Sequence, residues 1–122
     1  MIPLSNKRDI FIEAYAKYTD PDPEENLLIN LRDSKLEQLK NDKQVQKVTM
    51  IEQSQTYLGM IPALRFQTSY ISNGHKYIED RIVASSDAVF ELYLRTEADR
   101  YQSDVVFLEM ILRTWKRFAL VE

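Results

Sequence analysis

Residues 61–84, IPALRFQTSYISNGHKYIEDRIVA, contain the pattern that decides the fold. Before the Asn73-Gly74 pair, hydrophobic and polar residues alternate, and this period of two is typical of a half-buried β-strand. Asn-Gly is the strongest short-range signal for a two-residue hairpin turn. The alternation resumes after the turn, although Asp80 interrupts the hydrophobic set. The stretch predicts two antiparallel strands. The position of Asp80 leaves two alternatives. Either a basic residue, Arg65 or another, pairs with Asp80, or the register of the strand slips by one residue there.

The segments on either side of this hairpin predict two more strands and a long helix. Residues 90–96 alternate again, and residues 45–58 are rich in β-branched residues with the polar content of an edge strand. Residues 101–118 carry a helical hydrophobic stripe, and Thr96 or Asp99 is placed to cap its start. The main stripe consists of Tyr101, Val105, Leu108, Leu112 and Trp115, widened by Ile111 and Phe118. Val106, Phe107 and Met110 lie outside this stripe, so the helix is hydrophobic over more than half its girth.

The N-terminal third is less regular. Residues 10–18 fit a strand or a helix, and their β-rich start favours a strand. Alternation over residues 27–31 predicts another strand, and the capping-box spacing of Ser34 and Glu37 predicts a short helix near 34–42. Together the segments predict one domain over residues 1–122 of the α+β class. Its antiparallel sheet has about five to six strands, packed by the short helix and the long C-terminal helix.

Composition excludes several chemistries. The 122 residues include no Cys, two Gly and one His, with a formal net charge of -3. Without Cys there are no disulfides, thiol nucleophiles or iron–sulfur ligands, and two glycines are too few for a phosphate-binding loop. The acidic balance argues against nucleic acid, and no hydrophobic run is long enough to span a membrane. We therefore expect no cofactor. The sequence does not decide the compartment. It fits the cytoplasm, or the envelope if the chain is a mature fragment that has lost a signal segment.

Three groups of residues are candidates for a functional site. His75 follows the hairpin turn, where an exposed turn residue is expected rather than a catalytic base. The acidic residues within 20–25 resemble a solvated loop more than a cation site. Tyr and Arg residues at the polar positions of the strands form a candidate partner-binding face, because both types are enriched at protein interfaces. This predicted face consists of Arg65, Tyr77, Arg81, Tyr93 and Arg95.

The order of these segments resembles the PsbP/DcrB superfamily over residues 27–118. The resemblance depends on the run YLGMIPAL at 57–64, the Asn73-Gly74 hairpin, the strand VFEL at 89–92 and the helix FLEMILRTW at 107–115. Thr114-Trp115 stands where Ser-Phe is usual in that family. The resemblance implies helices packed on an antiparallel sheet and non-enzymatic work as an accessory subunit, assembly factor or docking chaperone. It transfers no functional residue, since the family shares no catalytic set.

The sequence therefore predicts a non-catalytic, bacterial protein-interaction or accessory domain whose partner is another protein. An alternative is a small inhibitor or immunity protein that blocks a toxin or host enzyme, because the chain is short, acidic and free of cysteine. A carrier with a small-ligand pocket in the sheet is a further alternative. The wide hydrophobic girth of residues 101–118 also leaves a homodimer open.

Overall fold

The computed structural model describes the backbone of residues 8–16, 24–85 and 88–121 and the side chains of residues 27–85 and 89–114. The elements in chain order are β1 (Arg8–Ala16), α1 (Glu24–Asn41), β2 (Val45–Leu58), β3 (Ile61–Ser72), β4 (His75–Ser85), β5 (Ala88–Glu97), the 3-10 turn η1 (Ala98–Arg100) and α2 (Tyr101–Val121).

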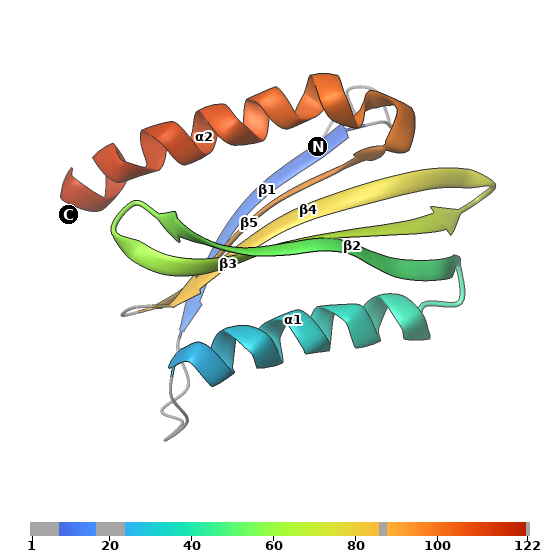
Figure 1. Ribbon diagram of the computed structural model, residues 1–122, viewed down its shortest axis with the longest axis horizontal. Helices are drawn as coiled ribbons and strands as arrows, with labels where there is room; N and C mark the ends of the chain where they lie inside the picture. The colour runs from blue at the N-terminus through green and yellow to red at the C-terminus, as the bar shows by residue number, and fades with distance from the viewer. Residues whose placement is uncertain (1–7, 17–23, 86–87, 122) are drawn as a thin grey trace.

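One antiparallel sheet forms the middle layer, with the strand order β1-β5-β4-β3-β2. The four strands from β2 to β5 follow one another as a meander, and β1 pairs antiparallel with β5 at the far edge. Figure 1 shows α1 on one face of the sheet and α2 on the other. The α+β class and the antiparallel sheet are thereby confirmed. Covering both faces requires hydrophobic positions on both sides of the central strands.

The hairpin predicted at Asn73-Gly74 is confirmed. Ser72 pairs with His75, and both residues between them have positive φ, 53° for Asn73 and 78° for Gly74. Positive φ at both central positions is the mark of a type I′ turn, which suits the twist of the strands it joins. Since the turn is two residues long, it fixes the register of β3 against β4 and places even positions of β3 opposite odd positions of β4.

The two faces of the sheet carry separate hydrophobic clusters. Under α2 the buried cluster contains Leu58, Ala63, Ile82, Ala84, Leu92, Leu94 and Leu108. Under α1 the cluster is smaller, with Leu28 and Leu31 packing on Leu64, Phe66 and Val83. The central strand β4 serves both clusters, and every residue from Glu79 to Ser85 is buried.

The helix predicted near 34–42 is confirmed as part of α1, but the strand predicted for residues 27–31 and the predicted start of the helix were wrong. Residues 27–31 belong to α1, which begins at Glu24, and Ser34 lies in the middle of that helix rather than at its cap. The short run of 27–31 fits either period, so alternation alone could not separate a strand from a helix. The sheet consequently has fewer strands than the six segments predicted. The strand preferred for residues 10–18 is confirmed over 10–16 as part of β1, whereas residues 17–18 and the side chains of β1 lie outside the described residues.

Strand β2 is the edge strand that its polar content predicted. Its register against β3 shifts twice, between Gln46 and Thr49 and between Met50 and Glu52, and Lys47 has a φ of 56°. Such bulges add twist and disturb the outer edge of a sheet. From Gln53 to Leu58 the pairing runs without a shift.

The C-terminal helix packs with the predicted stripe. Leu108 is fully buried, and Tyr101, Val105 and Leu112 pack around it, whereas Trp115 and Phe118 lie outside the described side chains. The predicted caps do not form, because η1 precedes α2 and its N-cap residue is Glu97, with no side-chain cap bond. Thr96 instead donates to Asp104 Oδ2 at 2.6 Å. Among the described residues, neither helix has the length and hydrophobic character needed to cross a membrane.

Leu108→Ala is expected to lower the free energy of unfolding by about 2–5 kcal/mol, because it removes a fully buried side chain and leaves a cavity. Denaturant titration measures the loss. Val106→Ala on the exposed side of the same helix is the control and should change the stability by about 0.5 kcal/mol or less. Equal losses in the two variants would contradict the inward direction of the Leu108 face.

Candidate functional site

A buried carboxylate organises the face of the sheet under α2. Asp80 on β4 has no exposed surface, and Arg65 on β3 grips both of its oxygens, with Nε at 2.8 Å from Oδ1 and Nη2 at 2.6 Å from Oδ2. The Tyr101 hydroxyl donates to Oδ2 at 2.7 Å. The prediction that a base such as Arg65 pairs with Asp80 is confirmed. Planar, two-point pairing is the strongest form of carboxylate–guanidinium contact.

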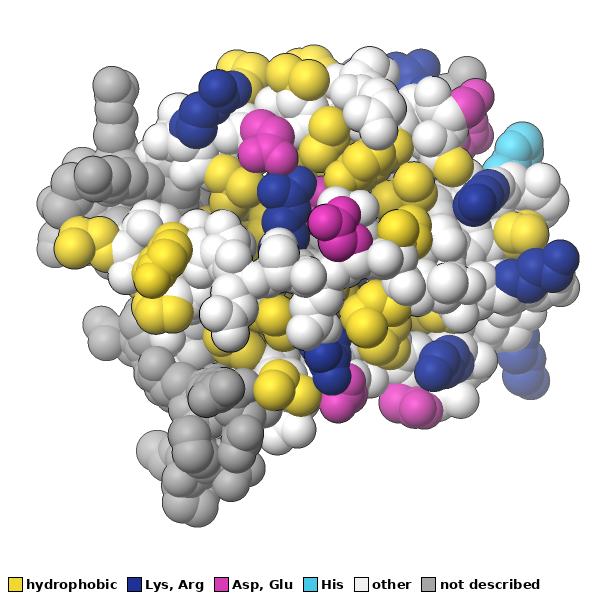
Figure 2. Space-filling model, in the orientation of Figure 1, with side chains coloured by type: hydrophobic (Ala, Val, Ile, Leu, Met, Phe, Trp, Pro, Cys, Tyr) yellow, Lys and Arg dark blue, Asp and Glu magenta, His cyan; other side chains and the backbone are white. Residues whose placement is uncertain are grey.

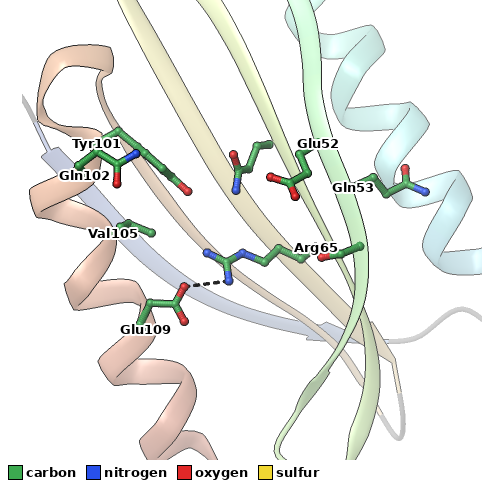
Figure 3. A pocket seen from close by; sticks show the side chains of 9 residues that line it. Glu52, Gln53, Arg65, Tyr101, Gln102, Val105 and Glu109 are labelled. Atoms are coloured by element: carbon green, nitrogen blue, oxygen red, sulfur yellow. Dashed lines mark ion pairs between the residues drawn. The ribbon is translucent and has the colours of Figure 1, made fainter.

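Arg65 also reaches the helix. Its Nη1 lies 3.0 Å from Glu109 Oε1, as the dashed line in Figure 3 shows. One guanidinium therefore ties β3, β4 and α2 together. The bond to Asp80 raises the pKa of Arg65 further above its ordinary value, and burial followed by the bond to Asp80 raises the pKa of Tyr101. Both groups stay protonated at neutral pH and keep donating.

A hollow of about 320 Å³ opens beside this cluster, between α2 and the strands β2 and β3. Figure 3 shows Arg65 and Glu109 extending toward each other across it. Its lining is mostly polar: Glu52, Gln53, Ser54, Arg65, Gln67, Tyr101, Gln102, Val105 and Glu109.

A second polar network lies on the opposite face, under α1. Arg81 bridges two carboxylates at 2.8 Å each, those of Glu91 and Glu79. The Tyr70 hydroxyl donates to Glu79 Oε2 at 2.7 Å, and Arg95 Nε donates to the Tyr70 oxygen at 2.8 Å. Burial, then the charge of Glu79, raises the pKa of Tyr70. The network runs across three strands, and its charged members neutralise one another.

The predicted partner-binding residues do not share one outer face. Arg65 lies under α2, whereas Tyr77, Arg81, Tyr93 and Arg95 lie under α1. Arg81 is only 8 % exposed, because its guanidinium stacks 3.9 Å from the centre of the Tyr93 ring. Arg95 lies 4.6 Å from the centre of the Tyr77 ring. The four residues are brought together as predicted, with Arg81 buried and Tyr77, Tyr93 and Arg95 half-buried.

The space between α1 and the sheet holds further pockets. A pocket of about 390 Å³ near the end of α1 is bounded by Arg81, Arg95, Tyr70 and Tyr93 together with Asp42. Near the start of α1, a more hydrophobic pocket of about 360 Å³ is lined by Leu28, Ile29, Gln53, Gln55, Pro62, Ala63, Leu64 and Ser85. The ligand-carrier alternative stays a prediction.

The remaining candidate residues from the sequence are His75, the neighbouring carboxylates Glu79 and Asp80, and the acidic segment 20–25. His75 begins β4 with its side chain 62 % exposed and Nδ1 3.8 Å from Glu97 Oε1. Glu79 and Asp80 point to opposite faces, as expected of neighbours in a strand. The segment 20–23 lies outside the described residues, and the side chains of Glu24 and Glu25 do too. Within the described part of the chain, no group of three or more His, Asp or Glu residues could hold a metal ion.

Exposed hydrophobic side chains lie on two elements. On β2 and the turn that follows it they form two pairs, Met50 and Ile51 at 42 % and 51 % and Tyr57 and Met60 at 65 % and 75 %, separated by the exposed polar residues 52–55. The other group lies on the outer side of α2: Val106, Phe107 and Met110, 43–50 % exposed. Figure 2 shows yellow side chains along the upper edge, where α2 runs in Figure 1, and again at the left end of the β2–β3 hairpin.

Comparison with known proteins supports the fold alone. No family model and no curated protein matches the chain. Among solved structures, the chain is similar to PA94 from Pseudomonas aeruginosa, a protein of unknown function, with a TM-score of 0.64, 12% identity and coverage of 88% of this chain and 80% of that one. It is also similar to LpqN, involved in cell envelope biogenesis of Mycobacterium tuberculosis, with a TM-score of 0.57, 19% identity and coverage of 88% of this chain. The match spans 61% of LpqN. No family model supports the PsbP/DcrB resemblance, and the two solved structures give it only weak support.

Asp80→Asn is expected to lower the free energy of unfolding by about 3–5 kcal/mol, because Arg65 keeps its charge while its buried partner loses one. Asp33→Asn is a matched control. It removes the same charge from an exposed pair with Arg32, so the change there should stay within about 0.5 kcal/mol. Denaturant titration of both variants decides the matter, and a loss below 1 kcal/mol for Asp80→Asn would show that the pair does not organise the sheet.

Stability is expected to fall as the pH rises above about 10, the ordinary pKa of tyrosine. Unfolded tyrosines ionise there, whereas the raised pKa values of Tyr70 and Tyr101 keep both protonated in the folded state. Their stabilisation is complete below that pH and is lost on the way to the folded pKa. Unfolding titrations at several pH values should show a shallower decline for Tyr70→Phe/Tyr101→Phe than for the parent, with Tyr57→Phe as the control. An unchanged slope in the double variant would refute this account.

Proposed function

We propose that this chain is a non-catalytic protein-interaction domain that docks an extended, hydrophobic segment of another protein along the edge strand β2. The observation that carries the proposal is the exposure of large hydrophobic side chains at both ends of the regular part of β2, Met50 and Ile51 at one end and Tyr57 and Met60 at the other. Hydrophobic groups gathered on one part of a protein surface are typical of interaction sites.

The position of these side chains on an edge strand suggests how the partner binds. Strand β2 is last in the sheet order, so its outer backbone groups have no strand partner among the described residues. Its bulges confine regular pairing to the stretch Gln53–Leu58. An extended peptide can add to such an edge, with backbone hydrogen bonds giving affinity and side-chain contacts giving specificity. Tyr57 and Met60, near the end of that stretch, would supply the hydrophobic contacts.

The polar clusters support a structural role for the charged residues. Arg65 with Asp80, and Arg81 with Glu79, already bond one another and connect the strands and α2. Their head groups are therefore engaged in holding the layers together. The fold shared with LpqN, a protein involved in cell envelope biogenesis, is compatible with an accessory role of this kind.

Site-specific photocrosslinking in the cells that make the protein tests this proposal. A photoreactive amino acid at Ile51 or Met60 should yield a discrete adduct with a second protein, because both side chains are exposed on the proposed surface. The same group at Lys76, exposed at the start of β4, is the control and should yield none. Mass spectrometry of the adducts identifies what is bound.

A charge on the surface should then abolish the adduct. With the photoreactive group at Ile51, Met60→Lys is expected to reduce the adduct at least tenfold, since it puts a charge in place of an exposed hydrophobic contact of the proposed surface. Gln46→Lys, an exposed polar position on β2 outside the regularly paired stretch Gln53–Leu58, should leave it intact. Adducts that contain only a second copy of this chain, or equal adducts from Lys76, would overturn the proposal.

A further inference from the structure

The pocket near the start of α1 has an uncharged, mainly hydrophobic lining. It holds about 360 Å³ and lies between the first turns of α1 and the end of the sheet that carries the β2–β3 turn (Figure 1). Leu28 and Ile29 line it from α1, and Pro62 and Leu64 line it from β3. None of the lining residues that the structure describes carries a charge. A volume of this size is typical of a site for a small molecule.

The register of the strands explains which side chains form the floor of this pocket. Leu64 pairs with Val83, and both belong to the hydrophobic cluster under α1. Ser85 follows Val83 by two positions along β4, so its side chain points to the same face of the sheet. The hydrophobic floor under α1 therefore ends, at the end of β4, in a hydroxyl group.

The hydroxyl of Ser85 is not used by the fold. Ser85 is 3 % exposed, and its Oγ has no hydrogen-bond partner among the described residues. A buried hydroxyl without a partner costs free energy, and native proteins leave few of them. The other polar groups of the lining differ, because Gln53 already accepts a hydrogen bond from Arg32 and Gln55 is exposed. Ser85 is therefore the group that a molecule in the pocket would pair with.

We propose that this pocket binds a small, uncharged hydrophobic molecule that carries one hydroxyl group, hydrogen-bonded to Ser85 Oγ. The volume has room for about ten non-hydrogen atoms at about 30 Å³ each. The hydrophobic body of the ligand packs on Leu28 and Leu64. A hydroxyl suits Ser85 because each of the two groups can donate or accept. A carboxylate or an ammonium does not suit the pocket, because its described lining offers no opposite charge and a buried, unpaired charge is costly.

Titration with 1-octanol, followed by NMR of the backbone amides and methyl groups, tests the site. This probe is uncharged, fits the volume and ends in one hydroxyl. Saturable shifts are expected at Leu28, Leu64 and Ser85, with a Kd of about 1 mM or lower. Octanoate has the same chain length but a carboxylate, so it should bind at least tenfold more weakly. The absence of saturable shifts, shifts only at exposed side chains of β2 and α2, or equal binding of octanoate would overturn the proposal.

Ser85→Ala tests the hydroxyl itself. Because this hydroxyl has no partner in the fold, the variant should be at least as stable as the parent in a denaturant titration. It should nevertheless bind 1-octanol about three- to tenfold more weakly, the effect of one lost hydrogen bond. Ser54→Ala is the matched control, because Ser54 lines the hollow under α2, and it should leave the Kd unchanged.

Two results for Ser85→Ala would contradict the proposed role of the hydroxyl. An unchanged Kd for 1-octanol would show that Ser85 does not contact the ligand. A loss of stability together with an unchanged Kd would show that the hydroxyl serves the fold, through a bound water or a backbone group, and not a ligand.

Discussion

The carboxylate of Asp80 can be buried in the centre of this sheet only because Arg65 meets both of its oxygens. An isolated carboxylate in such a place would cost several kcal/mol, and the two-point contact together with the Tyr101 hydroxyl offsets that cost. The partners come from β3 and from the start of α2, so the charge is satisfied only when three elements are in place. The pair thereby makes the position of α2 depend on the register of the β3–β4 hairpin.

Under α1, buried charges are neutralised by a different arrangement. There, Arg81 is shared between Glu79 and Glu91, and the aromatic rings of Tyr93 and Tyr77 cover the guanidiniums of Arg81 and Arg95. Charged and aromatic groups fill a region where the small hydrophobic cluster of α1 does not reach. Hydrophobic residues hold one half of α1, and a neutralised polar network underlies the other half. Among the described side chains, the large exposed hydrophobic groups lie on β2, on the turn after it and on the outer side of α2.

Local patterns predicted β1 to β5, the Asn73-Gly74 turn and the pairing of Asp80, because each depends on neighbours within a few positions or on one hairpin, although they also predicted a strand at 27–31 that does not form. They did not predict which face of a strand is covered. Glu79 and Arg81 occupy polar positions that appear open to solvent in the sequence, yet mutual pairing lets both be buried. The start of α1 was missed because the short run at 27–31 fits two periods. The exposed group on β2 depends on what lies beside an edge strand, which only the assembled sheet reveals.

The pairing of β1 with β5 has a consequence for how the chain is made. Arg8 is bonded in register with Thr96, so the first strand must wait for the last strand before it has a partner. At the speed of protein synthesis, that wait is on the order of 5–15 s. The four-strand meander can form from local contacts during this time, while β1 closes a loop that spans most of the chain. Until β5 is made, β1 has no partner in this sheet, and the edge of β5 that receives β1 stays open until the two meet.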